Sequence, residues 1–473
     1  MKAKLALAMG VALYSTTALS AGNTLFDDVG PLTTPAAAIP ESQELVTPFV
    51  LPNEPTIRFS QEVIADRNTQ LGLGQQNSGS WDMIDSNRTG PDANRYLFMP
   101  FEPSSGSGVQ RVDLWDTNYN TRTMTLVDPL TDNFIRGDAS RWTPWGGWLT
   151  GEENTGTSFG TLHGRMFEVT NPVAATGPGD TDFVHRSIIP RVAHEGLAFD
   201  GDNTLYFIDE LTGGSIYRFM SADANATNGD DFFAAGTVSV AKIAGGNNAD
   251  AVGNVVWEAL TDASGTPLAA VNAAIDLITG DLVGDAAANL VGATEYQRPE
   301  DMEVTTLANG NTFLAIAMTG SDEVYGLDLF TDMMSVFADQ STIDLATAMP
   351  VGSAFNNPDN MAIDADGNFY IIEDQGVPNA DIWRALDLNN DGDLLDPGEG
   401  LSRWAGLQTV GAEPTGLFFD LANPNVAYVN VQHPSSGNDA LVRISAVPVP
   451  GAGLLMGGAL LGLAGLVRNK RHG

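Results

Sequence analysis

From residue 95 onward, short apolar runs alternate with polar turns that are rich in Gly, Asn and Asp. Such runs, bounded by turn residues, predict β-strands joined by hairpins, and long stretches with helical periodicity are scarce. The Ala-rich stretch 269–288 is an exception, where we expect a helix or a loop within an insertion. The pattern predicts an all-β body over residues 91–446. Residues 22–90 are rich in Pro, Thr, Asn, Gln and Gly with weak periodicity, so we expect a loosely structured lead-in segment.

One unit recurs four times within this body. Each copy begins with a short polar, acidic segment and continues with a strand, a turn built on Asp, Asn or Gly, and a second strand. The acids at these positions are Glu195, Glu300 with Asp301, Asp359 and Glu413. Hairpin units repeated at irregular intervals favour a β-propeller with insertions. Two β-sandwiches are the alternative, but they give no reason for an acid at the same place in each unit.

The position of these acids predicts a metal site. In a propeller, the strand of each blade that lies nearest the axis begins at one rim of the central channel, so the acids would converge on one pocket. Converging carboxylates repel one another unless a cation lies among them. Oxygen ligands of this charge suit Ca²⁺, or a trivalent iron ion, better than zinc. We therefore expect a hard metal ion in an axial pocket, either Ca²⁺ or a trivalent iron ion.

A tryptophan-rich strand, predicted from Trp145 to Thr150, leads into Glu152-Glu153-Asn154. Side chains alternate along a strand, so Glu152 and Asn154 share one face and Glu153 takes the other. We expect Glu152 and Asn154 to be metal ligands at the pocket. An exposed acidic turn is the alternative.

Two further residues adjoin the candidate ligands. Arg298 stands directly before Pro299-Glu300, and its planar fork of donors suits a phosphate or carboxylate, so Arg298 and Glu300 are the candidate catalytic residues. A salt bridge that relieves the local density of acids is the alternative for Arg298. We expect His194 to hold Glu195 in place rather than to coordinate a metal.

A second type of calcium site is predicted in the loop that follows residue 386. Oxygen-bearing side chains at its first, third and fifth positions, with Gly392 at the sixth, match the spacing of EF-hand-type calcium loops. The twelfth position is Gly398, and Glu399 comes one residue late. We expect a calcium site that stabilises the fold, with an empty turn as the alternative. Its candidate ligands are Asp387, Asn389, Asp391 and Asp393.

The charge of the chain narrows the choice of partners. The 473 residues include 59 acidic residues against 22 Lys and Arg, which gives a net charge of −37. This balance argues against nucleic acid and anionic lipid, and favours bound cations or a saline medium, although solubility alone also explains many of the charges. The chain has no cysteine, which excludes disulfides, thiolate metal ligands and thiol nucleophiles.

Both ends of the chain predict export. Residues 1–21 have two early lysines, a short apolar run and small residues near position 20, the pattern of a secretory signal peptide. Residues 447–473 have two prolines, about 20 apolar and Gly residues and then a basic cluster, which predicts one transmembrane helix with a cytoplasmic end. This tail resembles bacterial PEP-CTERM/VPxPA-type sorting signals. The resemblance implies an exported protein that is held at least transiently in the membrane and processed by a dedicated protease; a plain anchor is the alternative.

Five motifs of the body, taken in order, resemble those of the PhoX-type alkaline phosphatases: W-T-P-W-G-G-W-L-T-G-E-E-N, H-E-G-L-A-F-D, R-P-E-D-M-E, P-D-N-M-A-I-D and E-P-T-G. The resemblance covers about residues 95–445 and implies a six-bladed propeller whose axial pocket holds calcium and iron and hydrolyses phosphomonoesters outside the cytoplasm. It implies that Arg298 contacts phosphate. The acids that it implies as metal ligands are Glu152, Glu195, Glu300, Asp359 and Glu413.

The chain departs from this family at one position. The family has a Cys before Glu-Glu-Asn that serves as an iron ligand, and Gly151 stands there in this chain. We expect the calcium-binding carboxylates to remain and the iron part of the site to be lost or altered.

Three functions stay open at this point. The first is a metal-dependent phosphomonoesterase acting on a small phosphate ester, and the second is a calcium-dependent lactonase. The third is a non-catalytic surface or matrix protein in which calcium only stabilises the fold. The sequence gives no oligomeric state.

Overall fold

The computed structural model describes residues 24–158, 160–201, 204–245 and 249–449. The predicted signal peptide lies outside these residues, and so does all but the beginning of the predicted sorting segment. None of the helices in the described part of the chain has the length and apolar character needed to cross a membrane.

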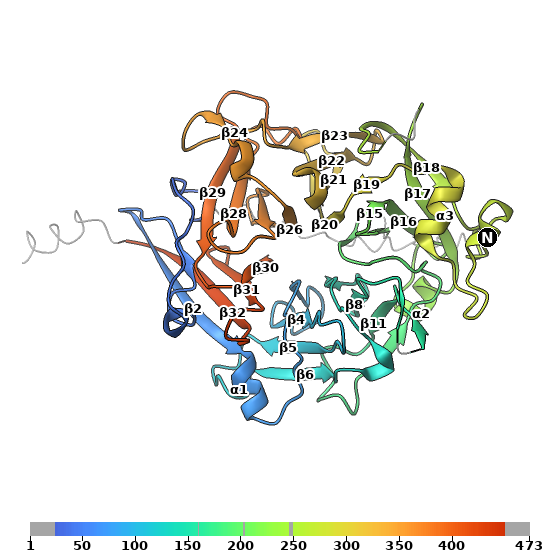
Figure 1. Cartoon of the computed structure of the whole chain (residues 1–473), viewed down its shortest axis with the longest axis horizontal. Helices are drawn as coiled ribbons and strands as arrows, with labels where there is room; N and C mark the ends of the chain where they lie inside the picture. Colours follow the sequence, from blue (N-terminus) through green and yellow to red (C-terminus); the bar gives the residue numbers. More distant parts are fainter. Residues whose placement is uncertain (1–23, 159, 202–203, 246–248, 450–473) are drawn as a thin grey trace, which may run out of the picture.

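Antiparallel sheets follow one another around a central axis in chain order, as the blades of a propeller do (Figure 1). One four-stranded sheet consists of β3 (Asp85–Ser86), β4 (Tyr96–Pro100), β5 (Val109–Asp113) and β6 (Thr123–Val127). The next consists of β7 (Arg141–Trp142), β8 (Trp148–Gly151), β11 (Met166–Val169) and β12 (Phe183–His185). The prediction of an all-β body is confirmed.

A nine-stranded sheet continues the circle. Its first part is β13 (Leu197–Phe199), β14 (Leu205–Ile208), β16 (Ile216–Ser221), β17 (Gly236–Ile243) and β18 (Gly253–Ala259). Its second part is β23 (Met333–Ala338), β22 (Glu323–Asp328), β21 (Thr312–Met318) and β20 (Pro299–Thr306). Because β18 pairs with β23 and joins the two parts, sheet order alone does not count the blades, and the predicted number of six stays a prediction.

Two sheets close the circle. One is built on β26 (Pro358–Ile363), β27 (Phe369–Glu373), β28 (Asp381–Leu386) and β29 (Gly400–Leu407), extended by β24 (Ile343–Asp344), β25 (Met349–Pro350) and β1 (Phe49–Val50). The other is built on β30 (Glu413–Phe419), β31 (Val426–Gln432), β32 (Ala440–Pro448) and β2 (Ile57–Asp66). Small hairpin pairs join β9 (Thr157–Ser158) to β10 (Thr161–Leu162), and β15 (Thr212–Gly214) to β19 (Tyr296–Gln297).

Helices are few and short in the part of the chain that the structure describes. The α-helices there are α1 (Arg67–Gly72), α2 (Gly229–Phe232) and α3 (Gly284–Val291), with 3-10 turns at Glu41–Gln43, Thr131–Asn133, Ala269–Ala274, Thr319–Ser321 and Gly352–Ala354. The Ala-rich stretch 269–288 therefore forms a 3-10 turn and the first part of α3.

The described part of the predicted lead-in, residues 24–90, differs from the loosely structured segment that we expected. Its strand β2 pairs with β32 along its length, so an N-terminal strand completes the last sheet. Phe26 is fully buried and packs edge-on against Trp404 and Phe419, with ring centroids 5.4 and 5.6 Å apart. Each such side chain contributes about 1.5–3 kcal/mol through burial. Strand pairing and aromatic packing give this segment a defined structure. Its polar composition shows neither of them.

The strands form groups along the chain, and in each group the first strand in the sequence lies nearest the axis. We call β3, β7, β13, β20, β26 and β30 the inner strands. Neighbouring inner strands contact one another, as β13 does with β20 and β20 with β26. All of them start at the same end of the channel, because each enters its sheet from the axis in the same direction. Residues at their starts therefore meet.

Candidate metal centre

Six carboxyl groups lie at, or a few residues before, the starts of the inner strands, and all of them line one pocket. We call them the inner ring: Asp82, Asp138, Glu195, Glu300, Asp359 and Glu413. The pocket, here the axial pocket, is also lined by Glu102, Glu153, Glu210, Asp374, Arg298 and Gln432. The sequence predicted Glu195, Glu300, Asp359, Glu413 and Arg298, and the structure brings these five together.

A second ring of residues lies just after the end of the second strand in each group of strands. We call these residues the outer ring: Glu102, Glu153, Glu210, Thr319, Asp374 and His433. The backbone N–H of Glu102, Glu153 and Glu210 donates to the carbonyl two residues before the inner-ring acid of the same sheet, at 2.8, 2.9 and 3.0 Å. Thr319 and Asp374 repeat this bond at 3.0 Å. It fixes the two rings to each other.

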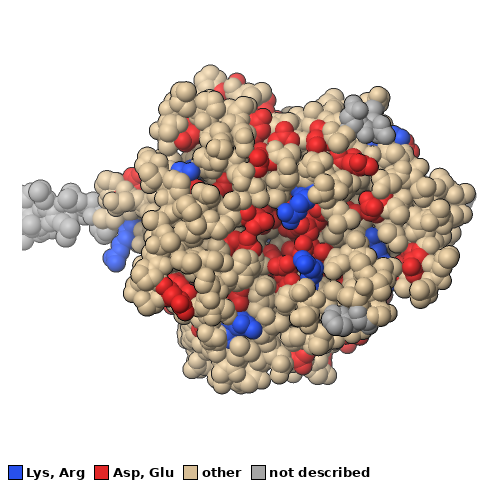
Figure 2. Space-filling view, in the orientation of Figure 1, with Lys and Arg blue, Asp and Glu red and all other residues tan. Residues whose placement is uncertain are grey.

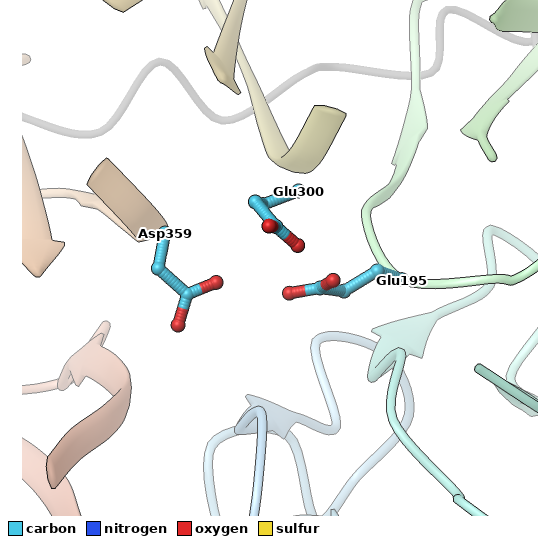
Figure 3. A group of neighbouring side chains, drawn as sticks. All are labelled: Glu195, Glu300 and Asp359. Atoms are coloured by element: carbon cyan, nitrogen blue, oxygen red, sulfur yellow. The ribbon is translucent and has the colours of Figure 1, made fainter. Parts of the chain in front are cut away.

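Three inner-ring acids approach closely enough to share a cation. Glu195, Glu300 and Asp359 come from separate strands, and their carboxyl groups point toward a common centre (Figure 3). One oxygen of each lies within 4.8 Å of the others. Glu195 is 4% exposed and Glu300 is 2% exposed. Buried oxygens at this spacing fit a calcium ion, whose oxygen ligands lie about 2.3–2.6 Å from the metal.

Burial without enough counter-charge raises the pKa of these acids. Burial raises the pKa of Glu195 and of Asp359 well above the usual range, and the nearby Glu300 carboxyl raises both further. Burial also raises the pKa of Asp82 to about 6 and that of Glu413 to about 7. Ten carboxyl groups line the axial pocket against one arginine. The pocket therefore needs protons or bound cations to balance its charge.

Basic groups stand at the outer side of the pocket. The Arg298 guanidinium contacts Glu210 and lies 3.1 Å from Glu300. His433 hydrogen bonds Glu413 at 2.6 Å, and this bond raises the His433 pKa to about 9. Figure 2 shows acids gathered at the centre of the face, with basic side chains at the edge of that patch. An anion can meet positive charge here before it reaches the acids.

The structure places Glu152 and Asn154 elsewhere than we expected. Glu152 is fully buried and accepts hydrogen bonds from the Arg165 side chain, at 2.7 and 2.9 Å, and from the backbone N–H groups of Arg165 and Ile135, at 3.1 and 3.4 Å. It also hydrogen bonds His163 at 2.9 Å. Asn154 accepts from the backbone N–H of Gly156 at 2.7 Å. Neither lines the axial pocket, and Glu153 does. Glu152 and Glu153 do face opposite sides, but Glu153 is the one that faces the pocket, because Glu152 points into the sheet, where Arg165 and His163 bind it.

Asp301 also turns away from the axial pocket. Its carboxylate accepts from the backbone N–H groups of Met302, at 2.7 Å, and Met361, at 2.9 Å. It thus links two inner strands, and only Glu300 of the adjacent pair faces the pocket.

His194 does not hold Glu195 through a side-chain bond; no such bond occurs within the described residues. Its ring is fully buried and packs on Phe207, with centroids 5.7 Å apart. Burial lowers the His194 pKa to about 3, so the imidazole is neutral. On the other side, a Cβ added to Gly151 would lie 2.3 Å from the Cβ of His194.

The close approach of Gly151 and His194 determines whether this site can hold iron. No side chain fits at Gly151 unless His194 moves, and the chain has no cysteine elsewhere. The residues present therefore fit calcium, through the carboxylates, and do not fit an iron site that depends on a cysteine before Glu152.

The loop at 387–399 lies apart from the axial pocket. Asp387 accepts from the backbone N–H groups of Asp391 and Gly392, at 3.3 and 2.9 Å. Glu399 is buried and accepts from Leu388 and Asp396, both at 3.0 Å. The oxygens of Asn389, Asp391 and Asp393 likewise accept from backbone groups two residues ahead. Calcium binding by this loop stays a prediction.

Residues that the sequence reasoning missed complete the pocket. They are Asp82, Glu102, Asp138, Glu153, Glu210, Asp374 and Gln432. A usable pattern existed for two of them, because the second strands of two repeats end in Ile-Asp-Glu210 and Ile-Glu-Asp374. Acids recur after the second strand as well as before the first.

Comparison with known proteins bears on the fold. Residues 139–328 match the family model described as "Alkaline phosphatase PhoX". The solved structure of Pseudomonas fluorescens PhoX in complex with vanadate, a transition state analogue, is similar with a TM-score of 0.56 and 15% identity, covering 88% of this chain and 98% of that chain. The chain has a PhoX-like propeller fold. At this identity the likeness shows the fold alone.

Other similarities are weaker. A putative phosphatase from Bacteroides thetaiotaomicron has a TM-score of 0.44 and 10% identity, with 88% of this chain and 78% of that chain covered. Virginiamycin B lyase from Staphylococcus aureus has a TM-score of 0.41 and 11% identity, with 82% and 99% covered. No curated protein sequence matches the chain.

Proposed function

We propose that the protein is a calcium-dependent phosphomonoesterase whose active site is the axial pocket. The observation that carries this proposal is the approach of Glu195, Glu300 and Asp359 to within 4.8 Å of one another, beside an arginine with free donors. The family match over residues 139–328 and the PhoX-like fold support it.

The acids would hold the metal and the arginine would hold the substrate. Glu195, Glu300 and Asp359 would be the calcium ligands, with Glu413 nearby, and a bound calcium ion supplies positive charge that polarises phosphoryl oxygens. Arg298 binds the phosphate through charge-assisted hydrogen bonds and stabilises the negative charge that develops on its oxygens. Glu300, 3.1 Å from the Arg298 guanidinium, orients that side chain toward the pocket. Iron has no part in this proposal, because the residues around Gly151 do not fit it.

The proposal also covers the number of blades, the export of the protein and the loop at 387–399. We infer that the six inner strands mark six blades. We also infer that residues 1–21 direct export to the periplasm, cell surface or medium, and that residues 447–473 form a sorting segment processed by a protease. The loop at 387–399 would hold a further, structural calcium ion.

The test is hydrolysis of p-nitrophenyl phosphate by the purified chain with added calcium. We expect activity that EDTA removes and that calcium alone restores. Glu300→Gln should lose nearly all activity, whereas Asp387→Ala, which changes an acid outside the pocket, should keep it. The absence of hydrolysis above the EDTA-treated control in the calcium-loaded chain would reject the catalytic part of the proposal.

A second candidate is a non-catalytic protein in which calcium only stabilises the propeller. Gly151 favours it, since the chain lacks the cysteine of the resembling phosphatases and His194 fills the adjacent space. This candidate predicts that Glu195→Ala and Glu300→Ala lower the melting temperature in calcium and that the unmodified chain has no activity to lose.

A further inference from the structure

Arg136 occupies the same place in its sheet as Arg298 does in its own. Each arginine stands two residues before an inner-ring acid, Asp138 or Glu300. The carbonyl of each accepts a hydrogen bond from the outer-ring residue of the same sheet, Glu153 at 2.9 Å or Thr319 at 3.0 Å. The two positions are therefore structurally equivalent.

Both arginines also share a backbone conformation that non-glycine residues rarely adopt. The φ angle is 44° at Arg136 and 52° at Arg298. Ser80 and Asn357, two residues before Asp82 and Asp359, also have a φ of 50°, so this backbone conformation is enforced by the turn at this place in the sheets. In both cases the left-handed backbone begins the turn that brings the next acid into the pocket.

The contacts of the two side chains match as well. Arg136 Nη1 lies 3.3 Å from Glu153 and 3.7 Å from Glu102, and Arg298 Nη2 contacts Glu210 and Glu300. Both side chains are 38% exposed, more than any of these acids, so the guanidinium groups lie on the solvent side. Burial, and the nearby Glu300 and Glu153 carboxyl groups, raise the pKa of Glu210 well above its usual range. Glu153 and Glu210 therefore lie close together, and so do the two arginines that contact them.

Each guanidinium keeps unused donors. Among the described residues, Arg136 hydrogen bonds through Nη1 only and Arg298 through Nη2 only. At least two nitrogens of each planar fork are therefore available to a ligand, which suits the paired oxygens of a phosphate group.

We propose that Arg136 is a second anion-binding residue at the mouth of the axial pocket and acts with Arg298 on the phosphate group of the substrate. This inference rests on the proposed function for the identity of the anion. In a pocket lined by ten carboxyl groups, two arginines on the solvent side give a phosphate dianion a positive region to enter.

The experiment measures the affinity of the calcium-loaded full chain for inorganic phosphate by calorimetry, and KM and kcat for p-nitrophenyl phosphate. Arg136→Gln should weaken phosphate binding by about tenfold or more and raise KM by a similar factor, with a smaller change in kcat. Arg136→Lys, which keeps the charge without the fork, should recover part of the affinity. The matched control is Arg443→Gln, since Arg443 is an equally exposed arginine paired with Glu62 on an outer strand, and it should change neither quantity.

The possible outcomes separate this inference from the proposed function. Phosphate binding that depends on Arg136 in a chain without hydrolytic activity would support the inference and reject the phosphatase. Hydrolysis with phosphate affinity and KM unchanged in Arg136→Gln would reject the inference alone. No phosphate binding by the unmodified calcium-loaded chain would reject the role of Arg136. A lower melting temperature with unchanged phosphate affinity would show that Arg136 only offsets the charge of Glu102 and Glu153.

Discussion

In the loop at 387–399, acids such as Asp387 and Glu399 accept hydrogen bonds from backbone N–H groups of the same loop, whereas in the axial pocket acids from six inner strands face one another. The loop stabilises its carboxylates locally, through contiguous sequence. The pocket buries its carboxylates, and burial raises the pKa of Glu195 and Asp359. A cation is therefore optional in the loop and required in the pocket if the acids are to be ionised at neutral pH.

The largest effect is expected from removing charge in the pocket. Glu195→Gln with Glu300→Gln should abolish activity and the stabilisation by calcium, which is about 2.7 kcal/mol when calcium is at 100 times its Kd. Without calcium the same variant should melt at a higher temperature than the unmodified chain, because the free-energy cost of burying these two carboxyl groups without a cation is removed. Thermal unfolding with calcium and with EDTA measures both. A variant that melts lower than the unmodified chain in EDTA would show that these acids do not repel.

A smaller effect is expected from placing a cysteine at position 151, where the phosphatases that the chain resembles have one. Gly151→Cys should lower the free energy of unfolding by about 1–3 kcal/mol, since the new Cβ would lie 2.3 Å from the Cβ of His194. His194→Gly in the same chain should relieve the contact, while His194→Ala should not, because alanine keeps the Cβ. The control is Gly179→Cys, an exposed position with open space around it. Equal unfolding free energies for the Gly151 and Gly179 variants would contradict this packing.

The calcium-free protein should lose stability as pH rises. Folding raises the pKa of Asp82 from 3.8 to about 6 and that of Glu413 from 4.5 to about 7, so between about pH 4 and 7 the folded state binds more protons than the unfolded state. The contribution of these groups is complete below about pH 4 and is lost as pH rises through the folded-state values. Melting temperatures in EDTA across this range should fall, and Asp82→Asn should flatten the slope. A melting temperature that rises over this range would contradict the assignment.

The smallest effect is expected in the loop. Asp387→Ala removes two backbone hydrogen bonds at a half-exposed position and should cost about 1 kcal/mol of stability. Activity and phosphate affinity should stay unchanged, as measured beside the pocket variants. A loss of activity as large as that of Glu300→Gln would remove the distinction between the two regions.

Whether the sequence predicts an acid of the pocket depends on the pattern of the residues before and after it. Glu195, Glu300, Asp359 and Glu413 stand before clear hairpins, so the repeat predicts their convergence. Asp82 was not predicted as a pocket residue, because it follows a Gly- and Asn-rich stretch in which no periodicity shows that Trp81 is buried. Its place in the pocket depends on long-range contacts, since Thr415 and Gln432 donate hydrogen bonds to its carboxylate.

The Glu152-Glu153 pair shows a second limit. Alternation along a strand predicts that the two acids face opposite sides, but it does not say which side is the pocket. That choice depends on Arg165 and His163, which bind Glu152 inside the sheet and lie in the segment between β10 and β11. The partners of a buried charge are set by tertiary packing, and a single sequence carries little information about them.

The most direct test of the account is the calcium content of the chain after equilibration and removal of loose metal, measured by elemental analysis. The unmodified chain should retain calcium and no iron. A variant with Glu195→Gln, Glu300→Gln and Asp359→Asn should retain less calcium than the unmodified chain by at least one ion, whereas Asp387→Ala should leave the pocket ion in place. Equal calcium in the unmodified chain and the triple variant would contradict a metal centre in the axial pocket.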